Sequence, residues 1–148
     1  MRITIVYFTS SGNTEKIATV LAERIRGCGH RVLLTRLDDA LPSDLSSADL
    51  LLVGSPAWSG ERVAQPVEEF LTDHLQRLQG KRLAFFGSYD WGEGRYFDDF
   101  LARLRSEGLD VYEKPLLFKV GDAEPQGDDV QAFMEEVLGV GSESFCPR

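Results

Sequence analysis

An apolar run passes directly into a hydroxyl-rich segment in the stretch Ile3-Thr4-Ile5-Val6-Tyr7-Phe8-Thr9-Ser10-Ser11-Gly12-Asn13-Thr14, and an amphipathic helical pattern begins near its end. Residues 2–8 are apolar enough to form a strand that is buried on both faces, as a central parallel strand is. Residues 9–14 then present backbone N–H groups and hydroxyl groups to one point, at the positive end of the following helix dipole. This strand, loop and helix therefore predict a binding site for a phosphate group.

Strand and helix patterns alternate along the rest of the chain. Further strands are predicted at residues 31–37, 50–55, 82–88 and 111–120. Helices are predicted at residues 14–28, 67–78, 97–104 and 130–138, with room for only a short helix within 38–48. Five strands that alternate with helices predict a parallel sheet covered on both faces, with right-handed crossovers. Pro115 inside the fifth strand fits only an edge position.

The predicted elements form one domain over residues 1–148. A chain of 148 residues with a hydrophobic share of 43% is long enough to bury a single sizeable core. No internal repeat or linker divides it. Residues 139–148 carry weak structure signals, so this tail is expected to be mobile.

Charge and composition argue against several classes of function. A net charge of −8 and a pI of about 4.7 disfavour nucleic acid and anionic membranes as partners and favour basic protein surfaces. Cys28 and Cys146 lie far apart without metal-ligand spacing, so they imply neither a disulfide framework nor a zinc site. No apolar run approaches the ~20 residues of a membrane span, and no signal-peptide pattern is present, so we expect a cytoplasmic protein.

Three of the predicted loops meet at one edge of the sheet. In such sheets a ligand binds at the carboxyl ends of the strands, and residues 9–14, 55–61 and 88–94 follow the first, third and fourth strands. Trp58 and Trp91 lie in the last two loops beside glycine and serine, where a buried core tryptophan is less expected. An indole in such a place suits stacking on a flat ring. A phosphate loop and two stacking indoles together predict a phosphorylated, planar cofactor, FMN.

Two motifs give the chain a resemblance to a known family. Residues Thr9-Ser10-Ser11-Gly12-Asn13-Thr14 are similar to the phosphate-loop pattern T/S-x-T/S-G-N-T of the short-chain flavodoxins, small FMN-dependent electron carriers of bacteria. The stretch Phe86-Gly87-Ser88-Tyr89-Asp90-Trp91-Gly92-Glu93-Gly94 resembles their flavin loop, with Asp90 where a glycine is common. The resemblance covers nearly the whole domain. It implies a flavodoxin-like three-layer α/β sandwich with a five-stranded parallel sheet of order 2-1-3-4-5.

The phosphate loop at residues 9–14 contains no lysine or arginine, so the phosphate must be bound by neutral donors. Besides the backbone N–H groups of the loop, these donors are the side chains of Thr9, Ser11, Asn13 and Thr14. Gly12 lets the backbone approach the phosphate closely. Ser55, at the end of the third strand, is either a further phosphate hydroxyl or simply a polar loop residue.

The resemblance also implies how the flavin ring is held. Trp91 is implied on the outer face of the ring and Trp58 on the inner face. The peptide between Ser59 and Gly60 resembles one that flips in the family to meet flavin N5 on reduction. Glu61 either accepts a hydrogen bond from flavin N3–H or is a solvated carboxylate at a helix start. The expected contacts from the two loops are Ser55, Pro56, Ala57, Trp58, Ser59, Gly60, Glu61, Ser88, Tyr89, Asp90, Trp91 and Gly92.

The resemblance implies a low-potential electron carrier with neither catalytic residues nor a metal site. Such a carrier binds FMN non-covalently and shuttles single electrons between redox proteins, cycling through a neutral semiquinone and an anionic hydroquinone. Acidic residues near the loops oppose the negative charge of the anionic form and lower its potential; they are Glu61, Asp90, Glu93, Asp98 and Asp99. The expected partners of this monomer are redox proteins with basic docking surfaces, such as hydrogenases, oxidoreductases of the ferredoxin-dependent type and NAD(P)H-dependent reductases.

An FMN-dependent NAD(P)H:quinone-type reductase of the same fold is the alternative. Such an enzyme needs a nicotinamide or quinone pocket over the ring, usually built from added loops or a partner subunit. This chain has little sequence to spare for one. Steady NADH oxidation by the purified protein alone would favour the enzyme, whereas its absence together with a stable semiquinone would favour the carrier.

Overall fold

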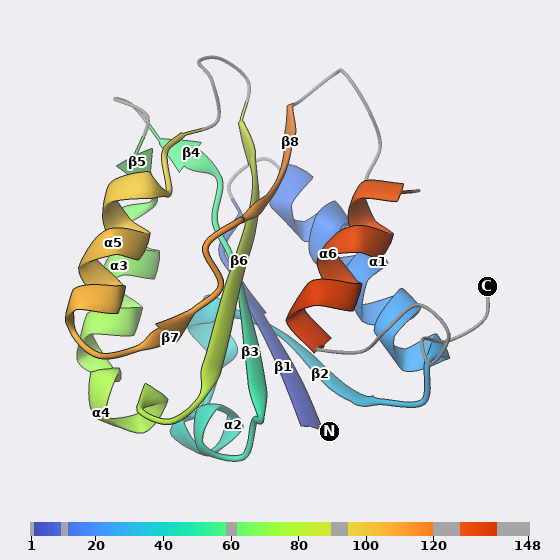
Figure 1. The fold of residues 1–148 in the computed structure, drawn as a ribbon, viewed down its shortest axis with the longest axis horizontal. Helices are drawn as coiled ribbons and strands as arrows, with labels where there is room; N and C mark the ends of the chain where they lie inside the picture. The colour runs from blue at the N-terminus through green and yellow to red at the C-terminus, as the bar shows by residue number, and fades with distance from the viewer. Residues whose placement is uncertain (1, 10–11, 59–61, 90–94, 120–127, 139–148) are drawn as a thin grey trace.

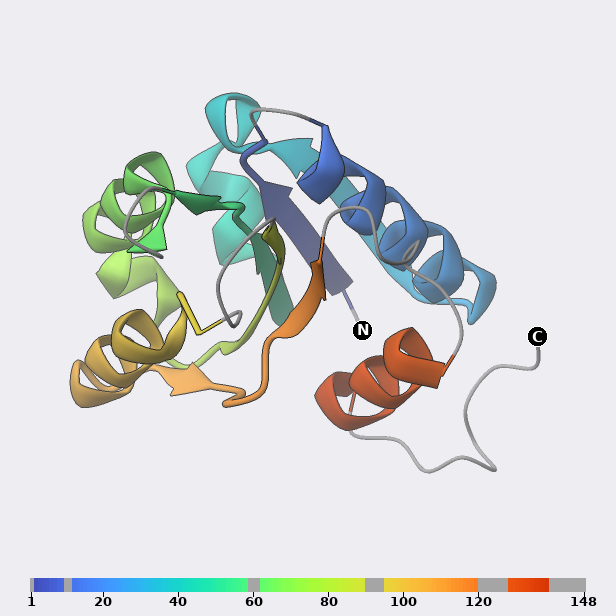
Figure 2. The same cartoon turned by 90° about the horizontal axis from the view of Figure 1, so that it is seen from above.

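The computed structural model describes residues 2–9, 12–58, 62–89, 95–119 and 128–138. They form a three-layer sandwich in which a mainly parallel sheet separates two groups of helices (Figures 1 and 2). One face of the sheet is covered by α1 (Asn13–Gly27) and α6 (Asp128–Leu138). The opposite face is covered by α2 (Pro42–Ser46), α3 (Gln65–Asp73), α4 (Leu75–Leu78) and α5 (Asp98–Ser106).

The sheet has the predicted strand order. Four parallel strands come first, in the order β2-β1-β3-β6. Their bounds are β1 (Arg2–Tyr7), β2 (Arg31–Arg36), β3 (Leu50–Gly54) and β6 (Arg82–Tyr89). The fifth position is shared by two short strands that both pair in parallel with β6, namely β7 (Asp110–Val111) and β8 (Leu116–Lys119). The order 2-1-3-4-5 and the flavodoxin-like sandwich are therefore confirmed.

The fifth strand differs from the sequence prediction because it is divided. The sequence predicts one strand over residues 111–120, but β7 ends at Val111 and β8 begins at Leu116. Pro115 lies in the gap, where its missing N–H removes a ladder hydrogen bond. Both short strands lie at one end of the described strand order, which agrees with the edge position predicted for Pro115.

Each central strand sends alternate side chains into two separate cores. In β1, Ile3 and Ile5 pack in the core that contains α1 and α6, whereas Val6 packs in the core that contains α3 and α5. In β3 all five residues are buried, and Leu52 and Val53 face opposite cores. This is the alternation expected of strands that are buried on both faces. Each fully buried aliphatic side chain contributes about 1.5–3 kcal/mol to folding.

Two local features after β3 differ from the sequence prediction. A short antiparallel hairpin of β4 (Ala57–Trp58) and β5 (Arg62–Val63) follows β3, so the loop after this strand is framed by a strand pair. The helix predicted over residues 67–78 is divided at His74, whose φ of −115° and ψ of 19° leave the helical region. The His74 ring packs against Phe70, with 4.8 Å between the ring centroids.

The described residues also bear on membrane and metal binding. None of their helices is long and apolar enough to cross a membrane. Within the same ranges, no group of three or more His, Cys, Asp or Glu side chains could hold a metal ion. Cys28, the C-cap of α1, is half-buried. The other cysteine of the chain, Cys146, lies outside the described residues.

Candidate cofactor-binding site

The carboxyl ends of β1 and β3 lie level with Phe86 of β6, and β6 continues beyond them to Tyr89. Tyr7 of β1 pairs with Gly54 of β3, and Gly54 pairs with Phe86 of β6. Just beyond the ends of β1 and β3, Phe8 N–H donates to Gly54 O and Ser55 N–H donates to Phe86 O, both at 3.0 Å. The register of the sheet therefore places the points where these loops begin along one edge of the sheet.

In the loop after β1, a glycine in the left-handed backbone conformation turns the chain into α1. Gly12 is the N-cap of α1 with φ 91° and ψ −7°. A Cβ there would meet nothing within 4 Å, so the backbone conformation alone requires glycine. Its N–H donates to Thr9 Oγ1 at 2.9 Å, and its carbonyl accepts from Lys16 N–H at 3.2 Å. The positive end of the α1 dipole therefore lies at this loop. Ser10 and Ser11 of the predicted phosphate loop lie outside the described residues.

Thr14 links the phosphate loop to the end of β6. It is 1% exposed, and its Oγ1 lies 3.1 Å from Oγ of Ser88, which is also buried. The two hydroxyls carry two hydrogens and share one hydrogen bond, so one hydrogen stays available to a further acceptor. Asn13, another predicted donor, is half-buried in the first turn of α1.

Ser55 is fully buried behind the loops. Its hydroxyl donates to Pro56 O at 2.9 Å and accepts from the N–H of Ala64, the N-cap of α3, at 3.0 Å. Both contacts of the hydroxyl lie within the chain. Pro56 is buried beside it, and Ala57 is half-buried.

Trp58 lies at the same edge of the sheet. It is half-buried on β4 and contacts Phe8 edge-on, with 5.8 Å between ring centroids and 71° between ring planes. Phe8 directly precedes the phosphate loop, so the indole stands beside that loop. Tyr89 is half-buried at the end of β6. The remaining predicted ring contacts lie outside the described residues; they are Ser59, Gly60, Glu61, Asp90, Trp91 and Gly92.

A buried tyrosine beneath the loops has no counterpart in the sequence predictions. Tyr96 is 4% exposed, and its hydroxyl donates to Ser55 O at 2.7 Å and lies 3.3 Å from Ser88 O. Burial raises the pKa of Tyr96 far above its usual value, so the hydroxyl stays protonated. Gly87 makes room for it, because a Cβ there would lie 2.0 Å from both Ser55 O and Tyr96 Oη. A glycine inside an apolar strand signals such a close approach, but it does not reveal which residue approaches.

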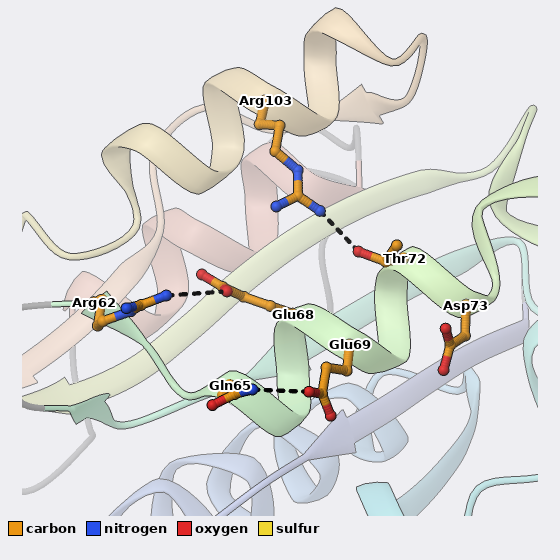
Figure 3. A pocket seen from close by; sticks show the side chains of 7 residues that line it. All are labelled: Arg62, Gln65, Glu68, Glu69, Thr72, Asp73 and Arg103. Atoms are coloured by element: carbon orange, nitrogen blue, oxygen red, sulfur yellow. Dashed lines mark hydrogen bonds and ion pairs between the residues drawn. The ribbon is translucent and has the colours of Figure 1, made fainter.

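A polar groove of about 730 Å³ runs between α3 and α5 (Figure 3). Arg62 of β5 forms an ion pair with Glu68 of α3 at 3.6 Å, and Arg103 reaches toward α3 from α5. Glu69 and Asp73 also line the groove, so three carboxylates stand against two guanidinium groups. Because Arg62 belongs to the hairpin after β3, this acidic groove borders the loop edge of the sheet.

Known proteins share the sequence pattern of this chain. The family model described as the flavodoxin domain matches residues 4–107. The chain belongs to the flavodoxin family. The flavodoxin of Megasphaera elsdenii is 33% identical over 125 residues, which are 84% of this chain and 91% of that protein. The flavodoxin of Clostridium beijerinckii is 33% identical over 128 residues, which are 86% of this chain and 93% of that protein.

The fold comparison agrees with the family. The solution structure of two-electron reduced Megasphaera elsdenii flavodoxin matches with a TM-score of 0.79 at 30% identity, covering 93% of this chain and 99% of that chain. Flavodoxins are electron-transfer carriers rather than enzymes. The family therefore confirms the resemblance and the class of function predicted from the sequence.

We expect Gly87→Ala to destabilise the protein, because its Cβ would overlap a backbone oxygen and a tyrosine hydroxyl. Overpacking of this kind costs about 1–3 kcal/mol. Gly27→Ala is the matched control, since a Cβ at Gly27 meets nothing within 4 Å and alanine favours the helix there. Urea unfolding of the two variants measures the difference, and wild-type stability of Gly87→Ala would contradict the close approach.

Proposed function

We propose that residues 1–148 form one domain that acts as a monomeric, cytoplasmic carrier of single electrons with non-covalently bound FMN. In this proposal the protein exchanges electrons with other redox proteins and cycles through a neutral semiquinone and an anionic hydroquinone. The observation that carries the proposal is the shared edge where a helix N-terminus, two buried hydroxyls and a half-buried indole meet. Membership of the flavodoxin family supports it.

The described part of the phosphate loop fits a phosphate group. Gly12 turns the chain at the N-terminus of α1, where backbone N–H groups and the helix dipole favour an anion. Thr14 and Ser88 retain one hydroxyl hydrogen that can be donated. Thr9 Oγ1 accepts from the Gly12 N–H and so keeps its own hydrogen for a ligand. We propose that this neutral donor set is completed by Ser10, Ser11 and Asn13.

Trp58 fits one face of a flat ring. Its indole is half-buried and is held by the β4–β5 hairpin and by edge-on contact with Phe8. We propose that Trp58 covers the inner face of the ring and Trp91 the outer face, and that residues 56–61 and 88–92 make the remaining contacts. When bound, FMN supplies the electron-transfer chemistry, whereas the protein binds the ring, orients it and excludes water from its faces. The hydroxyl of Ser55 accepts a hydrogen bond from the N–H of Ala64 and so fixes the start of α3.

The acidic groove supports basic proteins as partners. Its three carboxylates exceed its two guanidinium groups, and the whole chain carries a net charge of −8. Opposite charge speeds the encounter of two proteins and orients it. We propose that redox proteins with basic docking surfaces, such as hydrogenases, oxidoreductases of the ferredoxin-dependent type and NAD(P)H-dependent reductases, approach the loop edge over this groove.

FMN is expected to bind the apoprotein far more tightly than riboflavin does, because the loop after β1 suits a phosphate. Thr14→Ala should weaken FMN binding by roughly 1–3 kcal/mol, since a charged acceptor loses a donor, and should affect riboflavin less. Thr19→Ala is the matched control, because the exposed Thr19 hydroxyl donates to Glu15 O on the outer side of α1. Fluorescence titration of the wild type and both variants with FMN and with riboflavin measures the six affinities.

Two results would contradict the proposed function. Equal affinity of the wild-type protein for FMN and riboflavin would show that residues 9–14 do not bind the phosphate. Steady NADH oxidation by the FMN-loaded protein alone would support the flavin reductase instead of the carrier.

The groove gives a separate prediction about partner association. The double variant Glu69→Gln and Asp73→Asn should slow electron transfer from the reduced protein to a basic c-type cytochrome several-fold at low ionic strength, because steering by charge weakens. Glu23→Gln on the exposed side of α1 is the control and should leave the rate nearly unchanged. Stopped-flow absorption measures the rates, and equal salt dependence of the double variant and the wild type would exclude the groove as the approach route.

A further inference from the structure

We propose that Tyr96 is a positioning residue for the flavin loops. Its hydroxyl holds the carboxyl ends of β3 and β6 at one separation, so that the two loops leave the sheet at the spacing that a flat ring requires. The inference rests on the proposed function, because it assigns the loops after β3 and β6 to the two faces of the ring.

The contacts of the hydroxyl place it between these two strands. Tyr96 Oη donates to Ser55 O at 2.7 Å and lies 3.3 Å from Ser88 O, so its hydrogen is shared unequally between two carbonyls. Ser55 directly follows β3, and Ser88 is the next-to-last residue of β6. The paired register of the two strands ends at Gly54 and Phe86. The tyrosine hydroxyl therefore bridges the strands just beyond their last paired residues.

The ring of Tyr96 is itself fixed in place. It stacks on Phe97 with 4.6 Å between centroids and 29° between planes, and Phe97 packs against Phe85 of β6 at 5.4 Å. Gly87 lets the hydroxyl come close to the strand, because any larger residue would place its Cβ 2.0 Å from Tyr96 Oη. Burial raises the pKa of Tyr96, so the hydroxyl keeps its hydrogen and acts as a donor.

Each bridged carbonyl leads into a different part of the site. From Ser55 the chain passes through Pro56 to the half-buried Trp58. At Ser88 the side chain contacts Thr14 of the phosphate loop, while the main chain continues through Tyr89 toward residues 90–94. Loss of the Tyr96 hydroxyl would leave two buried carbonyls short of a donor. We expect the two strand ends to separate as these carbonyls form hydrogen bonds with other donors. The space between the two loops that cover the faces of the ring would then widen.

Tyr96→Phe tests this role, because it keeps the aromatic packing and removes only the hydroxyl. Tyr112→Phe is the matched control: the Tyr112 hydroxyl donates to Glu136 on α6, and the Tyr112 N–H donates to Leu83 O near the start of β6, at the opposite end of that strand from the loops. We would measure the affinities of each apoprotein for FMN and for riboflavin, the midpoint potential of the FMN-loaded protein and the thermal unfolding temperature of the apoprotein.

For Tyr96→Phe we expect both affinities to fall, roughly three- to tenfold, because FMN and riboflavin share the flavin ring whose site is altered. The midpoint potential should shift as the ring environment changes, whereas Tyr112→Phe should match the wild type in affinities and potential. Lower thermal stability of Tyr96→Phe with wild-type affinities and potential would overturn the proposal, because the hydroxyl would then serve folding alone.

Three further outcomes keep the test decisive. If Tyr96→Phe folds only with flavin bound, the rate of FMN release from the loaded protein replaces the titration, and a wild-type rate overturns the proposal. If the wild-type protein itself fails to bind FMN, the proposed function fails. If the wild type binds FMN and Tyr96→Phe behaves identically, only the role of Tyr96 is lost.

Discussion

The candidate site depends on one constraint, which is that Ser55 O and Tyr96 Oη pack directly against the backbone of Gly87. A single Cβ at this position would stand 2.0 Å from Ser55 O and from Tyr96 Oη, so the ends of β3 and β6 meet only because the residue is glycine. Buried hydrogen bonds extend this contact in both directions. Ser88 Oγ reaches Thr14 in the phosphate loop, and Ser55 Oγ accepts from the backbone at the start of α3. A buried polar group of this network that loses its hydrogen-bond partner costs about 1–3 kcal/mol of folding free energy. This cost keeps the residues where the loops begin in one arrangement.

The rest of the fold fixes where these loops begin. The central strands are buried on both faces between two separate cores, and their register places the ends of β1 and β3 beside Phe86 of β6. The loops can therefore vary in sequence while a rigid sheet positions them. The absence of lysine and arginine from residues 9–14 gives the edge a further property. In the proposed function the phosphate is held by dipoles and hydroxyls, so the surroundings of the ring stay acidic and oppose a second negative charge.

The sequence predicts the layers of this fold well, because burial on both faces and helical periodicity are local signals. The strand order came with the flavodoxin resemblance and is confirmed. The division of the fifth strand beside Pro115 and the helix break at His74 were missed, since each depends on a few backbone angles that periodicity does not encode.

In the site, the sequence motifs identified the hydroxyl residues but not the groups that their side chains contact. Ser55 is turned inward to the start of α3, and Thr14 contacts Ser88, 74 residues further along the chain. Tyr96 escaped prediction for the same reason, because its strongest partner is a backbone oxygen 41 residues away. The roles of residues 59–61 and 90–94 stay predictions.

An anaerobic reductive titration of the FMN-loaded protein, followed by visible absorption, distinguishes a carrier of single electrons from a two-electron flavin enzyme. We expect two separate one-electron steps, with the long-wavelength absorption of a neutral semiquinone rising and then falling as electrons are added. A single two-electron step without that absorption would contradict a carrier of single electrons, even if FMN binds tightly at the sheet edge.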